Sequence, residues 1–173
     1  MIIKLTGALL ILISGSSIGW IIGTSYLNRV RDLKELQTAI NIFNTEISYG
    51  QTLLPEALEK AAAVINSNLG ELLLQAAGSL KKSRGKTFAD IWTKKINNYS
   101  CYATLDDEDI KILKNWGNQI GKSSLAEQRK INKLTAKRLE QQEDQAQKRA
   151  STRVKLVRYA GVLLSLLVII LFY

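Results

Sequence analysis

The sequence contains no histidine, one cysteine (Cys101) and one proline (Pro55). Without histidine, the chain cannot build a serine–histidine or cysteine–histidine nucleophile pair, a histidine metal site or a histidine general base. A single cysteine excludes a disulfide framework and a zinc cluster within one chain, and Cys101 is interpreted as an inert thiol. We therefore expect no catalytic residue, no cofactor, no metal ion and no small-molecule substrate, and predict that the protein is not an enzyme.

The scarcity of proline and glycine points to the fold class. One proline and 11 glycines in 173 residues favour long helices over a β-sandwich or a disordered chain. No stretch shows the alternation of apolar and polar residues that is typical of a strand, and no repeat of 20 to 50 residues is visible. The sequence predicts an all-α protein with enough apolar residues for one core.

Basic residues outnumber acidic residues in this chain. The chain carries 24 Lys and Arg against 15 Asp and Glu, for a formal net charge of +9. This excess indicates an anionic partner or a membrane surface without identifying which.

Two runs of uncharged residues stand near the ends of the chain. Residues 5–28 would span roughly 36 Å as a helix, more than a hydrocarbon core of about 30 Å, whereas residues 159–173 reach about 22 Å. We predict membrane helices at 1–27 and 156–173, with a helical domain at 28–155 between them. A cleaved signal peptide and a buried helix of a soluble protein are the alternatives for the first run.

Basic residues cluster at the inner ends of both runs, which predicts that the central domain is cytoplasmic. They are Arg29, Arg31 and Lys34 after the first run, and Arg149, Arg153, Lys155 and Arg158 before the second.

Small residues recur every four positions in both apolar runs, at Gly15, Gly19 and Gly23 and at Gly161 and Ser165. Such spacing places them on one helix face, where a second helix can approach closely. The two helices are expected to pack on each other or on other membrane proteins. The alternative is that glycine is simply common in membrane helices.

The central domain reads as a series of amphipathic helices. The first apolar stripe comprises Val30, Leu33, Leu36, Ile40, Phe43 and Ile47. This helix can continue unbroken from the first apolar run to about Tyr49, with Gly50 as its stop and Pro55 in the first turn of the next helix. Shorter helices follow over 56–65, 69–80, 87–96 and 106–120, and one helix runs from Ser124 to the end. We expect an antiparallel bundle of about six helices.

Three charged clusters each allow a purely structural and a functional interpretation. Lys81–Lys86 is a solvated helix end or a phosphate-binding cluster, and Asp106–Asp109 complements a helix dipole or binds a cation. Lys133, Lys137 and Arg138 form a basic stripe that could touch acidic lipid or a partner. The structural interpretation is favoured for the first two clusters.

One segment carries a family resemblance. Glu46-Ile47-Ser48-Tyr49-Gly50-Gln51-Thr52, followed by Leu54 to Leu58, resembles the hallmark of the stage III sporulation protein AB family of endospore-forming bacteria. Weaker matches are Arg29 to Leu36, Ala89 to Trp92, Leu113, Gly117, Ile120, Gly121, Gln128, Lys155, Tyr159 and Gly161. Leu53 and Ser124 depart from the family pattern, at two turns.

The resemblance implies an antiparallel six-helix soluble domain similar to the cytoplasmic domains of the type II secretion inner-membrane platform protein. It implies a non-catalytic role in assembling a secretion-like channel between mother cell and forespore during sporulation. The expected location is the mother-cell membrane facing the forespore. The implied partners are a secretion-type ATPase and other channel subunits, with a homo-oligomer also open and no nucleic acid.

The motif residues Glu46, Tyr49, Gly50, Thr52 and Pro55 allow two interpretations. They form a helix stop and turn that orients the following helices, which we favour, or a surface that docks a partner. For the whole chain, the alternative function is a membrane-tethered module that binds anionic lipid or nucleic acid through its basic faces.

Overall fold

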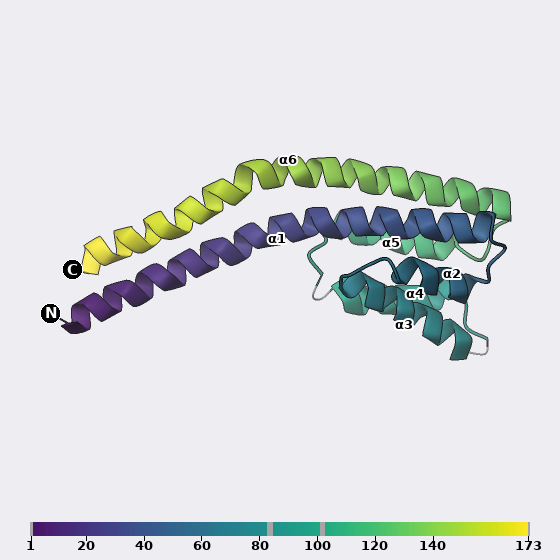
Figure 1. The fold of residues 1–173 in the computed structure, drawn as a ribbon, viewed down its shortest axis with the longest axis horizontal. Helices are drawn as coiled ribbons and strands as arrows, with labels where there is room; N and C mark the ends of the chain where they lie inside the picture. Colours follow the sequence, from purple (N-terminus) through teal and green to yellow (C-terminus); the bar gives the residue numbers. More distant parts are fainter. Residues whose placement is uncertain (1, 83–84, 101–102, 173) are drawn as a thin grey trace. The chain divides into compact units, whose positions relative to one another are not determined.

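The structure, a computed structural model, describes residues 2–82, 85–100 and 103–172. These residues form six helices and no strand, which confirms the predicted all-α class (Figure 1). The helices are α1 (Ile2–Ser48), α2 (Leu54–Ala62), α3 (Asn68–Lys82), α4 (Phe88–Ser100), α5 (Asp107–Gln119) and α6 (Leu125–Phe172). The first helix runs unbroken from an apolar half into a polar half, and the last helix runs unbroken from a polar half into an apolar half, as their sequences predict.

The chain divides into two compact units, and α1 and α6 contribute to both. Met1–Val30 with Gln145–Tyr173 forms one unit, here called the apolar hairpin, and Arg31–Asp144 forms the other, here called the bundle. The predicted membrane boundaries at residues 27 and 156 concern the bilayer and stay predictions.

Residues at the first turns of the short helices stabilise the helix starts. Thr87 and Asp90 form the expected reciprocal cap of α4: the Thr87 amide donates to Asp90 Oδ2, and the Asp90 amide donates to Thr87 Oγ1, each at 3.3 Å. At α5, the Asp106 amide donates to Asp109 Oδ2 at 3.0 Å. Pro55 lies in the first turn of α2, where its missing N–H costs no hydrogen bond. The predicted position of Pro55 in the first turn of this helix is confirmed.

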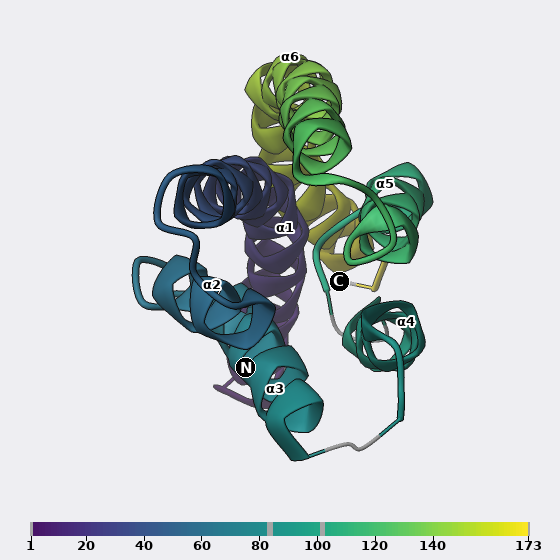
Figure 2. The same cartoon turned by 90° about the vertical axis from the view of Figure 1, so that its right-hand side faces the viewer.

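The core of the bundle joins its helices around a cluster of aromatic rings. All six residues of the apolar stripe on α1 are buried. The rings of Phe43, Phe88, Trp92 and Trp116 meet with centroids 5.1 to 5.9 Å apart, three of the four contacts being edge to face. The end-on view in Figure 2 shows the helices that contribute these residues around a shared interior. A void of only about 10 Å³ remains between side chains of α1 to α5.

A buried polar chain attaches α6 to this core. Trp116 Nε1 donates to Asn132 Oδ1 at 2.8 Å, and Asn132 Nδ2 donates to Asn44 Oδ1 at 3.2 Å. Asn132 is only 1% exposed, so its amide depends on these partners in place of water. The polar half of α6 therefore docks through Asn132, Thr135 and Leu139, all buried, while Leu125 and Leu134 point outward.

Two glycines offer a matched test of the packing. A Cβ at Gly117 would collide with the Trp92 ring, whereas a Cβ at Gly78 in α3 would meet open space. We expect Gly117→Ala to destabilise the protein by about 1–3 kcal/mol through overpacking. Gly78→Ala should stabilise it by about 0.5–1 kcal/mol through higher helix propensity. Urea unfolding of the full chain in detergent, followed by tryptophan fluorescence, measures both, and equal effects would contradict the packing described here.

Candidate functional site

The turn that follows α1 is built around the carboxylate of Glu46. Its Oε2 accepts hydrogen bonds from Thr52 Oγ1 at 2.8 Å and from Lys60 Nζ at 2.6 Å, and the Thr52 amide donates to the Glu46 carbonyl at 3.3 Å. The structure thus joins two residues of the predicted motif and adds Lys60 of α2, which sequence reasoning missed. These bonds, Lys60 first, lower the pKa of Glu46, because they favour the ionised carboxylate. The ionised Glu46 therefore stabilises the turn near neutral pH, and this contribution is lost as the pH falls through its lowered pKa.

Gly50 serves the turn by its lack of a side chain. A Cβ there would lie 2.8 Å from both the Glu46 carbonyl oxygen and Thr52 Oγ1. The left-handed conformation usual for a glycine at a helix end is instead adopted by Gln51, with φ of 47°. The helix stops near the expected position, but close approach rather than a positive φ accounts for the glycine.

Tyr49 projects from this turn and is 81% exposed. The Arg129 guanidinium carbon lies 5.4 Å from its ring centroid, and Arg129 Nη2 donates to the Ser48 carbonyl at 2.6 Å. Arg129 therefore fixes the end of α1 and offers the ring a cation–π contact.

Two exposed leucines lie close in sequence to Tyr49 or to Arg129. Leu53, 69% exposed, ends the turn that Tyr49 begins. Leu125, 56% exposed, stands one helical turn before Arg129 on α6 and so shares its face. We call Tyr49, Leu53, Leu125 and Arg129 the turn surface. An exposed aromatic ring beside an arginine and apolar side chains is typical of protein-binding surfaces.

Small residues form the contact inside the apolar hairpin. A Cβ at Gly161 would lie 2.6 Å from the Gly15 carbonyl oxygen and 3.2 Å from the Gly19 Cα, so the two backbones touch. Ser165 packs on Gly15 and donates its hydroxyl to the Gly161 carbonyl at 2.7 Å. The structure brings these four predicted residues together. Gly23 instead faces the side chain of Arg158.

The outer surface of the hairpin is apolar. Large side chains such as Leu10, Trp20, Ile21, Leu163 and Ile170 are more than half exposed, while Gly19, Gly23 and Ser165 are buried. Both helices are long and apolar enough to cross a membrane.

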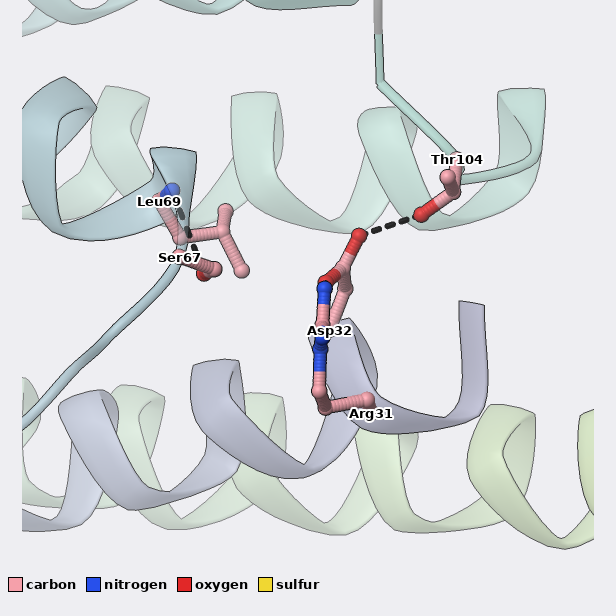
Figure 3. A network of polar contacts seen from close by, with 5 residues as sticks. All are labelled: Arg31, Asp32, Ser67, Leu69 and Thr104. Carbon is pink, nitrogen blue, oxygen red and sulfur yellow. Dashed lines mark hydrogen bonds and ion pairs between the residues drawn. The ribbon is translucent and has the colours of Figure 1, made fainter. Parts of the chain in front are cut away.

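A buried carboxylate, missed by sequence reasoning, lies in the bundle (Figure 3). Asp32 is 6% exposed, Thr104 Oγ1 donates to its Oδ2, and Arg31 Nη2 lies 3.8 Å from its Oδ1. Among the described residues, Oδ1 has no hydrogen-bond partner. Burial chiefly, with the nearby charge of Glu35, raises the pKa of Asp32, against the opposing effects of Thr104 and Arg31. The same view shows the Leu69 amide donating to Ser67 Oγ at the start of α3.

Some residues of the remaining charged clusters form ion pairs or hydrogen bonds. Lys81 pairs with Glu59 at 2.7 Å, and Asp109 caps α5. Lys133, Lys137 and Arg138 are exposed on α6. Ser83, Arg84 and Cys101 lie outside the described residues. Within the part of the chain that the structure describes, no group of three or more His, Cys, Asp or Glu could hold a metal ion.

The hairpin contact can be tested with a pair of leucine substitutions. Gly161→Leu should separate the helices and cost about 1–3 kcal/mol, because the added side chain meets backbone. Gly7→Leu is the control, since nothing lies within 4 Å of a Cβ at Gly7. Unfolding of the full chain in dodecyl sulfate, followed by circular dichroism, reports the difference; a loss that is equal for both variants would argue against the contact.

The buried carboxylate predicts a pH dependence. The folded state holds a proton on Asp32 more tightly than the unfolded state does, so stability falls as the pH rises through the raised pKa. Asp32→Asn keeps an acceptor for Thr104 and removes the charge. We expect the variant to gain stability over the wild type as the pH rises from about 4 to 7, with little difference at lower pH. Thermal unfolding at a series of pH values measures this gain, and a constant difference would show that Asp32 is not the group responsible.

The chain is similar to known proteins in sequence and in fold. The model of the stage III sporulation protein AB family matches residues 4–173. Stage III sporulation protein AB of Bacillus subtilis (strain 168) is 25% identical over 169 residues, covering 98% of each chain. A solved structure of stage III sporulation protein AB (SpoIIIAB) superposes with a TM-score of 0.66 and 24% identity, over 71% of this chain and 96% of that one. The chain belongs to the stage III sporulation protein AB family.

Proposed function

We propose that the protein is a non-catalytic, membrane-anchored assembly component of a secretion-like channel complex that forms between mother cell and forespore. The observation that carries this proposal is the turn surface, where the ring of Tyr49 is exposed beside the guanidinium of Arg129. The family supplies the sporulation role. A docking role accords with a sequence that lacks histidine and therefore much of the usual acid–base chemistry.

Anchoring is supported by the reversed polarity of the apolar hairpin. Soluble proteins bury large apolar side chains, whereas this unit exposes many of them and buries Gly19, Gly23 and Ser165. The hydroxyls of Ser14 and Thr24 donate to the carbonyls of Leu10 and Trp20, which satisfies them without water. Both apolar halves then cross the membrane. The basic residues beside them favour a cytoplasmic bundle. Together with the sporulation role of the family, this supports a mother-cell location, with the anchors in the membrane that faces the forespore.

The turn surface docks the protein partner. Glu46, Thr52 and Lys60 close the turn, and Arg129 holds the end of α1, so the backbone that carries Tyr49 is already ordered before a partner binds. Tyrosine and arginine are enriched among the residues that dominate binding energy at interfaces. The proposed partner is the secretion-type ATPase that the family resemblance implies. Other channel subunits and a second copy of the chain are further partners that the exposed apolar residues would admit.

Substitution at Tyr49 tests this docking. The full chain is reconstituted in nanodiscs and titrated with the purified ATPase encoded beside the gene, with binding read by biolayer interferometry. Tyr49→Ala should weaken binding by about tenfold or more, the usual effect of losing a central aromatic residue. Leu74→Ala on α3, where the side chain is 50% exposed, should leave affinity within about twofold.

The alternative function makes a different prediction in the same assay. Binding of anionic lipid or nucleic acid through the basic stripe at Lys133, Lys137 and Arg138 would fall steeply with salt. Wild-type binding to the ATPase that survives moderate salt and depends on Tyr49 supports the platform role. Equal binding by Tyr49→Ala and the wild type would show that the turn surface does not dock the ATPase.

A further inference from the structure

The two units differ sharply in charge. The apolar hairpin contains seven basic residues and no acidic residue, whereas the other 17 basic residues stand with all 15 acidic residues in the bundle. The basic residues of the hairpin are Lys4, Arg29, Lys148, Arg149, Arg153, Lys155 and Arg158. The hairpin therefore has no carboxylate side chain of its own to pair with a cation.

Arg158 is the last of these cations before 15 uncharged residues. Its guanidinium carbon lies 4.1 Å from the centroid of the Trp20 ring. Gly23, one helical turn beyond Trp20, leaves room for the side chain, since a Cβ there would lie 3.3 Å from Arg158 Nε and 3.6 Å from its Cγ. Arg158 thus lies across α1, stacked on an aromatic face.

The charge on Arg158 lacks an anionic partner among the described residues of the hairpin. Its Nε is buried and has no hydrogen-bond partner there. The cation–π contact with Trp20 stabilises the guanidinium but leaves its positive charge without an anion. A guanidinium carries five N–H donors in a planar fork that matches the oxygens of a phosphate.

The surroundings of Arg158 identify the source of that phosphate. Trp20 and Tyr159 are 61% and 67% exposed, as is typical of aromatic residues at the level of lipid headgroups. Ile21, next to Trp20 in the sequence, and Leu156, two residues before Arg158, are 69% and 61% exposed and present an apolar surface to acyl chains. We propose that Arg158, stacked on Trp20, binds the phosphate of an anionic phospholipid whose acyl chains lie along the hairpin.

Lipid retention by the full chain tests this site. The protein is purified in mild detergent, freed of lipid and titrated with phosphatidylglycerol, and the bound lipid is counted by native mass spectrometry. The wild type should retain phosphatidylglycerol, and Arg158→Gln should weaken its binding by about tenfold or more. Arg153→Gln is the matched control, because it removes the same charge from an exposed position on the same helix. It should weaken binding by less than about threefold.

Further variants and ligands define the outcome. Trp20→Leu should weaken retention because the guanidinium loses its platform, and Arg158→Lys should give an intermediate affinity because it keeps the charge without the planar fork. Phosphatidylcholine should bind more weakly than phosphatidylglycerol. Equal losses in Arg158→Gln and Arg153→Gln would overturn the proposal in favour of diffuse attraction. Displacement of the lipid by millimolar inorganic phosphate would overturn the lipid as the source. Neither result bears on docking at Tyr49.

Discussion

The hydrogen bond from Trp116 to Asn132 is the interaction on which the bundle depends. Asn132 lies in a helix segment with few apolar residues, so burial of apolar surface alone gives α6 little reason to dock. The indole N–H of Trp116 must itself be satisfied, and its ring touches those of Phe43, Phe88 and Trp92. One tryptophan therefore joins the apolar core to the polar helix, and Asn132 passes the connection on to Asn44 of α1.

This docking fixes the position of Arg129, which stands one helical turn before Asn132. Arg129 in turn reaches the last carbonyl of α1 and the ring of Tyr49. The contact between Arg129 and the Tyr49 ring thus depends on the buried hydrogen bonds that join Trp116, Asn132 and Asn44. A substitution that loosened α6 would affect the turn surface without touching it.

Sequence patterns reveal the local part of this design. The stripe from Val30 to Ile47 recurs at helical spacing, and the cap between Thr87 and Asp90 joins residues three positions apart, so short-range patterns can predict both. The pairs Glu46–Lys60, Asp32–Thr104 and Tyr49–Arg129 join residues 14, 72 and 80 positions apart, and no periodicity encodes such contacts. The family hallmark marks the turn itself, but only the fold shows that Lys60 completes it and that Gly50 is small because Glu46 and Thr52 close over it.

The small-residue contact within the hairpin has a consequence for assembly stoichiometry. Gly15, Gly19 and Gly161 already face one another, so a second copy that packed through the same glycines would first have to displace its own α6. The two arrangements compete, and the internal partner has the advantage of a high effective concentration because it belongs to the same chain. Self-association in a membrane would then proceed through the bulky outer face of the hairpin or through the bundle, and crowding the protein in the membrane would not by itself exchange one glycine contact for the other.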